Sequence, residues 1–260
     1  MLKNAIERFK NSNRLKNITK ISSGTLAGQI ISFITVPIFT RIYGAEILGI
    51  WAFLNSIYLF VNSFSDLGLT FSIMVEKDEN KREKIYQILT TIILLFSFIT
   101  SIIIGVIYTF FKENDTNLNI WFLMIYSLIA IFTLQQVQIC YTWLNRNGKY
   151  DILMKNPLIN NLSFGIIGII LGIIGLKQYG YYIGWIAGQI VTLMNMKKYM
   201  PKKSINVNIR EYKEIFKESL NFIKYQLPTN IINVLKNQLP TFIIKLFFRK
   251  YYVRVLFNNT

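Results

Sequence analysis

The sequence contains no histidine and a single cysteine, and its acidic residues are few. Without histidine the chain lacks the usual general base and the commonest metal ligand, which excludes every Ser-His or Cys-His catalytic arrangement. Cys140 lies alone inside an apolar run, so an intramolecular disulfide and a thiolate metal cage are excluded too. Gly-rich phosphate loops and HExxH or CxxC motifs are also absent. We therefore expect no enzymatic activity, no catalytic residues, no metal and no cofactor.

Apolar residues dominate the composition: 52% of the 260 residues are hydrophobic and only 16% are charged. A soluble domain of this size has no core large enough to hide so much apolar surface, so the bilayer must act as the solvent. Lysine and arginine number 29 against 13 aspartate and glutamate, a net charge of +16. Such an excess fits nucleic acid, acidic lipid or the cytoplasmic loops of a membrane protein, and its distribution decides between them.

Uncharged runs predict where the chain crosses the membrane. A helix needs about 20 apolar residues to span the hydrocarbon layer. Five long runs carry no charge, and a sixth, residues 47–75, contains only Asp66. We expect an all-α integral membrane protein, a six-helix bundle plus an incomplete seventh span, or half of a two-lobe transporter. The six spans are predicted near residues 21–41, 47–74, 85–111, 119–144, 156–176 and 179–197.

The distribution of lysine and arginine predicts the orientation of the chain. The N-terminal segment and the connections after the second, fourth and sixth spans are rich in these residues. The other connections hold one each, namely Arg41, Lys112 and Lys177. The positive-inside rule then places the N-terminus in the cytoplasm of a multi-pass protein of the bacterial inner membrane. Because the segregation explains the basic excess, we expect no nucleic-acid partner.

A second apolar region begins after a polar interval and differs from the first six spans. Lys224, Lys236 and Lys245 interrupt it, together with two prolines. A lysine near the middle of the bilayer opposes insertion by roughly 2.5–3.5 kcal/mol, so this helix alone is marginal. The predicted organisation is a basic amphipathic cytoplasmic segment (1–20), a six-span lobe (21–197), a cytoplasmic connector (198–219), the start of a second lobe (220–248) and an atypical tail (249–260).

Polar side chains inside the predicted spans are the candidate functional residues, because each is costly when it faces lipid. Asp66 either pairs with a lysine or a backbone group, or lines a hydrated path and binds a coupling ion or proton. Lys236 would attract a phosphate if it faced the centre of a bundle. Arg41 either snorkels to the headgroups or contacts a ligand, and Gln29 is a polar residue of the first span. These four are the predicted substrate-binding residues.

Glycines recur at helical spacing in the fifth and sixth spans. They are Gly165, Gly168, Gly172 and Gly175 in the fifth, and Gly180, Gly184 and Gly188 in the sixth. Both series place a smooth stripe on one helix face, which lets a neighbouring backbone approach closely. We predict a tightly packed helical hairpin; glycines that permit bending during transport are the alternative.

Several short motifs occur in an order that resembles one transporter family. The first span ends in Thr40 and Arg41, a turn with Gly44 and Glu46 follows, and the second span closes on DLG at residues 66–68. The fourth span exits through WLNRNGKY, and YQLPTNIINVLKNQLPTFIIKLFF opens the later apolar region. Over residues 8–248 the chain resembles the polysaccharide (O-antigen and capsule repeat-unit) flippases of the multidrug/oligosaccharidyl-lipid/polysaccharide exporter superfamily.

The resemblance implies two six-helix bundles that face each other across a central cavity. A polyprenyl-diphosphate-linked oligosaccharide would enter with its head in the cavity and its tail in lipid, and alternating access would flip it. The implied role is export of repeat units for surface polysaccharides such as the O-antigen of lipopolysaccharide. The implied partners are this lipid-linked oligosaccharide, the lipid bilayer, and a second-lobe polypeptide or polysaccharide-assembly proteins.

The chain departs from the resembled family in length. Family members have about twelve or more spans, whereas we count about seven, so the sequence reads as truncated after its first lobe and inactive unless another chain completes it. Two other functions remain open: a drug or cation exporter of the same superfamily, and a membrane-embedded polymerase of the polysaccharide pathway. An exporter of cations favours an acidic cavity, and a polymerase needs a large external loop or an acidic pair.

Overall fold

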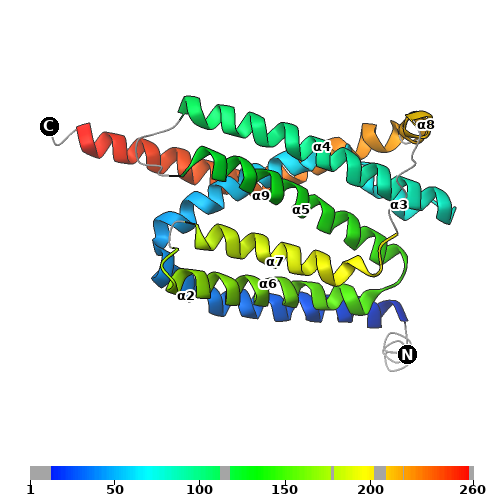
Figure 1. Cartoon of the computed structure of the whole chain (residues 1–260), viewed down its shortest axis with the longest axis horizontal. Helices are drawn as coiled ribbons and strands as arrows, with labels where there is room; N and C mark the ends of the chain where they lie inside the picture. Colours follow the sequence, from blue (N-terminus) through cyan, green and yellow to red (C-terminus); the bar gives the residue numbers. More distant parts are fainter. Residues whose placement is uncertain (1–12, 112–117, 177–178, 202–208, 219, 258–260) are drawn as a thin grey trace, which may run out of the picture. The chain divides into compact units, whose positions relative to one another are not determined.

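The computed structural model describes residues 13–111, 118–176, 179–201, 209–218 and 220–257. Within these ranges the regular structure is entirely helical, as predicted (Figure 1). Parts of the predicted basic segment, connector and tail, and the connections at Lys112 and Lys177, lie outside the described residues. The helices are α2 (Asn13–Ser65), α3 (Thr70–Val75), α4 (Glu79–Phe111), α5 (Ile120–Arg146), α6 (Tyr150–Ile173), α7 (Gly180–Lys197), α8 (Ile209–Glu218) and α9 (Leu220–Phe257).

Four of these helices are long and apolar enough to cross a membrane: α2, α4, α5 and α6. Helix α2 contains the first two predicted spans, because the backbone at Gly44 leaves the helical region (φ 81°, ψ 157°) and divides it into two helices. Glycine adopts this positive φ without the steric penalty of a side chain. The sixth and seventh predicted spans correspond to α7 and α9, which are not among the four helices, so their crossing of the membrane stays a prediction.

Large apolar side chains lie on the outside of the long helices. On α4, Leu95, Phe98, Ile99 and Phe110 are exposed, and Phe110 is 80% accessible. On α2, Phe33 is 83% accessible. Contact of such an apolar surface with water is unfavourable, whereas its contact with the hydrocarbon core of a bilayer is not. The chain is a multi-pass membrane protein.

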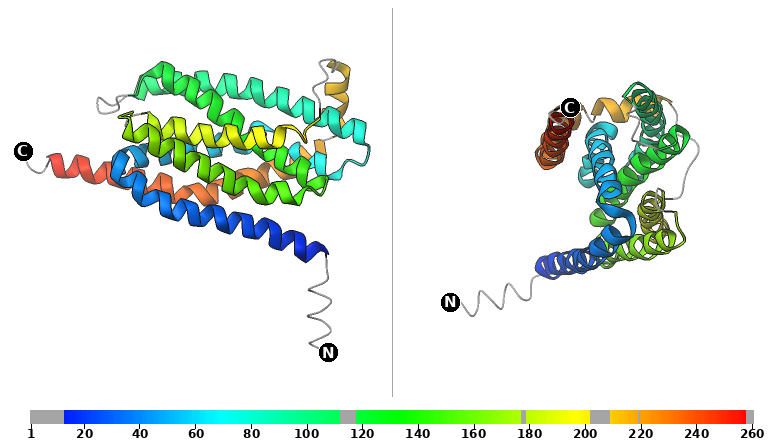
Figure 2. Two further views of the ribbon diagram at one scale, coloured as in Figure 1. Left: turned by 60° about the horizontal axis from the view of Figure 1, so that its bottom comes forward. Right: turned by 90° about the vertical axis from the view of Figure 1, so that its left-hand side faces the viewer.

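The chain divides into two compact units. Unit 1 consists of residues 1–44 and 136–202, and its helices α6 and α7 lie side by side (Figures 1 and 2). A methyl group at Gly184 would lie 2.8 Å from the Cα atom of Gly168, and one at Gly188 would lie 2.8 Å from the carbonyl oxygen of Asn160. Only glycine allows the two backbones to approach so closely. The predicted packing role is confirmed for the other glycines of the two stripes but not for Gly175, which follows α6 with a positive φ (99°) and where an added methyl group would meet nothing within 4 Å.

The first part of α2 packs against α6 in the same way. A methyl group at Gly24 would overlap the carbonyl of Met154, and one at Gly165 would meet the side chain of Thr35 at 2.9 Å. The buried Tyr43 hydroxyl donates a hydrogen bond to the carbonyl oxygen of Gly168. The helices of unit 1 are therefore held together by close backbone approach at glycines, with the rings of Phe39, Phe164 and Tyr181 packed between them.

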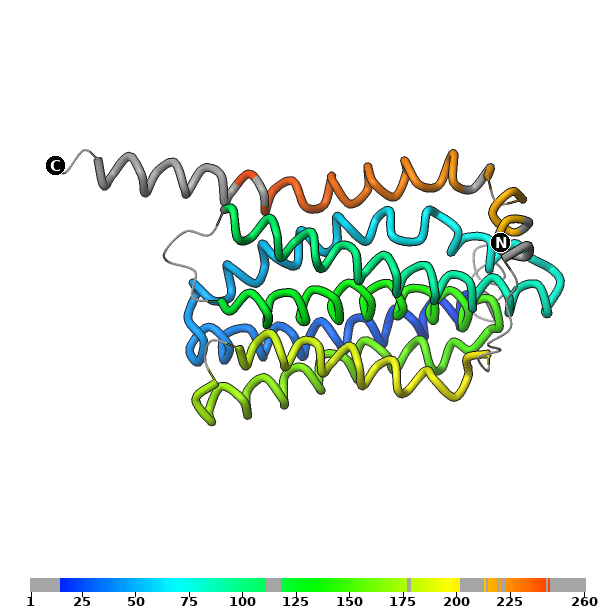
Figure 3. Tube along the Cα trace, turned by 45° about the horizontal axis from the view of Figure 1, so that its top comes forward, coloured from blue at the N-terminus to red at the C-terminus, as the bar shows by residue number. Residues whose placement is uncertain are grey.

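Unit 2 consists of residues 45–135 and 203–260 and is packed mainly through side chains. Trp51 Nε1 donates to the hydroxyl oxygen of Tyr126 at 2.9 Å, and the hydroxyl groups of Tyr58 and Ser127 lie 3.0 Å apart. These bonds join the second part of α2 to α5. Figure 3 follows the trace from α2 through α3 into α4, and α3 also contacts α9.

Candidate functional site

Asp66 occupies a turn that interrupts the second predicted span. Helix α2 ends at Ser65, and the chain turns through Leu67 (φ 52°) and Gly68 (φ 76°) before α3 begins at Thr70. The Asp66 carboxylate is only 3% exposed and accepts hydrogen bonds from the backbone nitrogens of Gly68 at 3.0 Å and Thr70 at 3.3 Å. These bonds satisfy backbone donors that the turn leaves unpaired. Of the predicted alternatives, the contact observed is the one with backbone groups.

Other buried polar groups accompany Asp66 in unit 2. Asn62 lies one helical turn before Asp66, and both polar atoms of its side chain are buried without a hydrogen-bond partner. The hydroxyl oxygen of Thr70 and the side-chain oxygen of Asn55 are in the same state. Buried polar atoms of this kind normally bind ordered water or a polar ligand. The interior of unit 2 is therefore suited to hydration.

Lys236 lies on α9 in unit 2, and its side chain is exposed. None of the ion pairs among the described residues involves it or Asp66, so the structure does not bring the two together as a pair. An exposed ammonium on a predicted span remains available to an anionic ligand.

Arg41 and Gln29 both lie on the first part of α2, in unit 1, and both are exposed. They are twelve residues apart, which corresponds to about 18 Å along a helix. They therefore do not converge on one small ligand. Arg41 precedes the break at Gly44, at the end of the helix where a cation also compensates the helix dipole.

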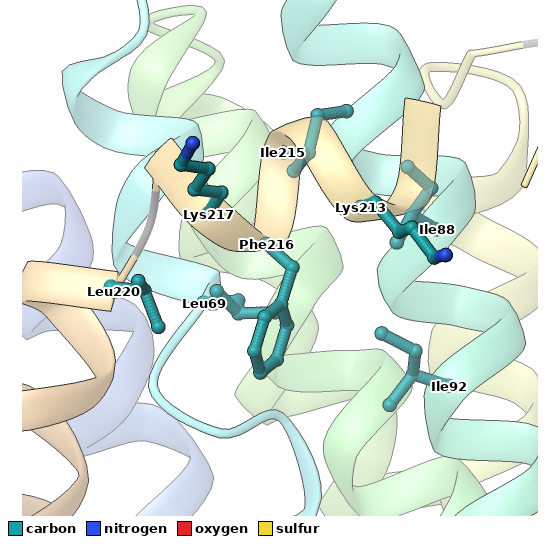
Figure 4. A pocket seen from close by; sticks show the side chains of 8 residues that line it. All are labelled: Leu69, Ile88, Ile92, Lys213, Ile215, Phe216, Lys217 and Leu220. Carbon is teal, nitrogen blue, oxygen red and sulfur yellow. The ribbon is translucent and has the colours of Figure 1, made fainter. Parts of the chain in front are cut away.

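A pocket of about 440 Å³ lies within unit 2, beside the Asp66 turn (Figure 4). Leu69 of the turn, Ile88 and Ile92 of α4 and Leu220 of α9 line it. Helix α8 contributes Lys213, Ile215, Phe216 and Lys217, and the Phe216 ring projects between Leu69 and Ile92 (Figure 4). The volume falls within the range of about 300–1,000 Å³ that ligand pockets occupy.

An ionic contact joins helix α8 to the charged beginning of α4. Lys81 Nζ forms a salt bridge with the carboxylate of Glu218, the last residue of α8, and lies 3.5 Å from a carboxylate oxygen of Glu76. The backbone N–H of Asp78 donates to Glu76 and is the main reason that the pKa of this carboxyl lies below its usual range. The side chain of Lys81 thereby helps to hold one wall of the pocket.

Comparison with known proteins places this arrangement in a family. The model of a family described as "Polysaccharide biosynthesis protein" matches residues 14–253, which is nearly the whole chain. The chain belongs to the polysaccharide biosynthesis protein family. Members of this family are generally transporters and flippases rather than enzymes, and they act in polysaccharide synthesis or export. Searches of curated proteins and of solved structures give no match.

The predicted site residues of this family member are spread over both units, and none of them lines the pocket. Gln29 and Arg41 belong to unit 1, whereas Asp66 and Lys236 belong to unit 2. Lys213 and Lys217 line the pocket. The sequence indicated only that they belong to the lysine-rich connection after the sixth predicted span. The amphipathic pattern of residues 209–216 was the available signal, because it indicates a helix that covers an apolar surface.

Proposed function

We propose that the chain takes part in moving polyprenyl-diphosphate-linked oligosaccharide repeat units across the inner membrane for surface polysaccharide biosynthesis. The observation that carries this proposal is the family match over residues 14–253 of a multi-pass helical protein. A lipid-linked oligosaccharide has a large polar head that cannot cross hydrocarbon unaided, so a polysaccharide pathway that assembles repeat units in the cytoplasm needs such a protein.

Three exposed polar residues are the proposed contacts with the substrate head. Lys236 of unit 2 would bind the diphosphate, since an ammonium group forms charge-assisted hydrogen bonds with phosphate oxygens. Arg41 of unit 1 is a separate proposed contact with an anionic group, which its guanidinium would bind in the same way. Gln29 offers an amide that can bind sugar hydroxyls. Asp66 is a weaker candidate for direct contact, because its carboxylate already accepts two backbone hydrogen bonds. A drug or cation exporter would bind positively charged compounds, which exposed cations disfavour.

The proposed topology places the N-terminus and the basic connections in the cytoplasm. It is testable by single-cysteine labelling in intact cells, because the native Cys140 is buried. With a membrane-impermeant maleimide, we expect a Lys177→Cys variant to be labelled from outside and a Lys149→Cys variant only after the cells are opened. The reverse pattern would contradict the orientation.

A second lobe is the proposed partner of this one, because the resembled fold forms its cavity between two bundles. Polysaccharide-assembly proteins are the other proposed partners. The lobe could bind the substrate head without its partner, so binding can be tested on the chain as it exists.

The experiment is a binding competition with the purified full chain in lipid nanodiscs. We expect it to bind a fluorescent polyprenyl-diphosphate oligosaccharide more tightly than a cationic drug-like dye. The Lys236→Ala variant should bind the oligosaccharide about tenfold more weakly, whereas Lys224→Ala, an exposed lysine on the same helix, should bind normally. Preference for the dye would favour the drug exporter and overturn the proposal. Equal binding by both lysine variants and the unchanged chain would remove Lys236 from the site.

A further inference from the structure

We propose that the pocket beneath α8 binds one anionic phospholipid, with an acyl chain in the pocket and the headgroup phosphate between Lys213 and Lys217. The lipid would be a resident component of unit 2 and not the transported substrate. The inference does not depend on the proposed transport function, because it rests on the residues of the pocket alone.

The polarity of the pocket matches that of a lipid from head to tail. The aliphatic stems of Lys213 and Lys217, which are four residues apart on α8, line the pocket, and their ammonium groups point away from one another at its rim (Figure 4). Its apolar part includes Ile88 and Ile92, which lie seven and eleven residues beyond Lys81 and inside the uncharged run of α4. At the helical rise this is about 10–17 Å from the charged beginning of α4. A phospholipid changes from phosphate to acyl chain over a comparable distance in the bilayer.

The ammonium groups of Lys213 and Lys217 are accessible to an anion. Neither takes part in an ion pair among the residues that the structure describes, and both are exposed. The neighbouring carboxylates of Glu76 and Glu218 are already paired with Lys81. Both lysine side chains are long and exposed, so they can turn toward a phosphate at the rim of the pocket. A zwitterionic headgroup has no net charge and gains less from the two ammonium groups.

The pocket is also held open by contacts within unit 2. The Lys81 salt bridge fixes the last residue of α8 to α4, and the hydrogen bonds of Asp66 fix the turn that supplies Leu69. Phe216 is 41% exposed and Leu220 is 49% exposed, so the apolar surface is incompletely covered by protein. An acyl chain would cover it without any rearrangement of the backbone.

The test is native mass spectrometry of the purified full chain with phosphatidylglycerol or phosphatidylcholine added to detergent. We expect one tightest phosphatidylglycerol site that phosphatidylcholine does not fill. The double change Lys213→Ala and Lys217→Ala should weaken that site about 25-fold, at about fivefold for each lysine. The matched control is Lys197→Ala with Lys198→Ala, which removes the same charge from exposed positions in unit 1. Equal losses in both double variants would overturn the proposal.

A second measurement tests whether the acyl chain of the lipid lies beside residue 216. In a Phe216→Trp variant, phosphatidylglycerol with brominated acyl chains should quench the added tryptophan more strongly than brominated phosphatidylcholine does. The excess quenching should vanish when Lys213 and Lys217 are both alanine and persist when both are arginine. Competition by water-soluble glycerol phosphate as strong as that by the lipid would show a site for free phosphate. Displacement by polyprenyl diphosphate and not by phosphatidylglycerol would show a substrate site, and either result would contradict the proposal.

Discussion

The two units of this chain are stabilised by different kinds of contact. In unit 1 helix backbones approach each other at glycines, so that a side chain as small as a methyl group has no room at Gly24, Gly184 or Gly188, and a cluster of aromatic rings packs between the same helices. In unit 2 the helices meet through tyrosine, tryptophan and serine side chains, and among the described residues its buried polar atoms without a partner are more numerous than those of unit 1. Close backbone packing resists rearrangement, whereas a polar and incompletely satisfied interior admits water and ligands. We therefore expect unit 1 to be the more rigid of the two, and the interior of unit 2 to be the one that holds bound water and ligands.

An added side chain should have the largest effect, and this effect should be greatest where two helix backbones meet in unit 1. A Gly184→Val substitution would drive a branched side chain into the backbone of Gly168 and should destabilise the protein by about 3 kcal/mol. The control is Gly49→Val in unit 2, where a methyl group would meet nothing within 4 Å. Thermal unfolding in detergent measures both variants. Equal effects at the two positions would show that the difference between the units is not one of packing.

Loss of a polar group in unit 2 should have the next largest effect. Asp66→Ala leaves the backbone N–H groups of Gly68 and Thr70 buried without an acceptor and should cost about 2 kcal/mol. Asp66→Asn keeps one oxygen acceptor and should recover about half of that loss. The measurement is the midpoint of urea or heat unfolding for both variants. If Asp66→Ala leaves stability unchanged but abolishes polysaccharide export, the carboxylate has a direct functional role.

Removal of a single hydroxyl group should lower the stability by less. It tests whether a side-chain hydrogen bond contributes to the stability of unit 1. Tyr43→Phe removes the hydrogen bond to the carbonyl of Gly168 while the ring stays in its aromatic cluster. We expect a loss of about 1 kcal/mol in unfolding free energy. Tyr225→Phe, at a ring that is 67% exposed, should have no measurable effect. If Tyr43→Phe lost much more unfolding free energy than Asp66→Ala, polar contacts would matter more in unit 1 than in unit 2, contrary to this account.

The contact between α8 and α4 should show the smallest effect and a dependence on pH. The hydrogen bond from Lys81 to Glu218 is the main reason that the pKa of the Lys81 ammonium is raised in the folded chain. The contact therefore contributes its full stability below the ordinary lysine pKa of 10.5, and the contribution is lost as the pH rises through the higher, folded value. Spin labels on α8 and α4 should therefore separate in strong alkali but not at pH 7. The Lys81→Met variant should show the separation at pH 7, at a cost below about 1 kcal/mol for a partly exposed pair, and Lys77→Met should not.

Features that depend on local pattern could be predicted from the sequence. The glycine stripes at residues 165–188 gave the right packing because spacing along a helix fixes which residues share a face. Hydropathy gave the spans contained in α2, α4, α5 and α6 because insertion depends on composition over about 20 residues. The predicted second span, residues 47–74, runs past the turn at Asp66, although the family motif closes that span on DLG at residues 66–68 and an aspartate two residues before a glycine is typical of a turn. The long apolar run around it concealed that signal.

Features that depend on packing between distant residues could not be predicted. The pocket needs Lys213 and Phe216 of α8 beside Ile88 of α4, more than a hundred residues earlier in the chain. Residues 209–216 have an amphipathic pattern, but this pattern does not show which surface the helix covers. The exposure of Arg41 and Lys236 likewise depends on which neighbours each helix meets. Hydropathy alone does not decide whether a polar residue of a span faces protein, lipid or a cavity.

The most direct measurement of the proposed function is the fate of lipid-linked repeat units in a bacterium from which the gene has been deleted. We predict that polyprenyl-diphosphate-linked oligosaccharide accumulates on the cytoplasmic side of the inner membrane and that surface polysaccharide is lost. Expression of the unchanged chain should restore export, and the Lys236→Ala variant should restore it poorly. Normal surface polysaccharide in the deletion strain, with no accumulated intermediate, would contradict the account.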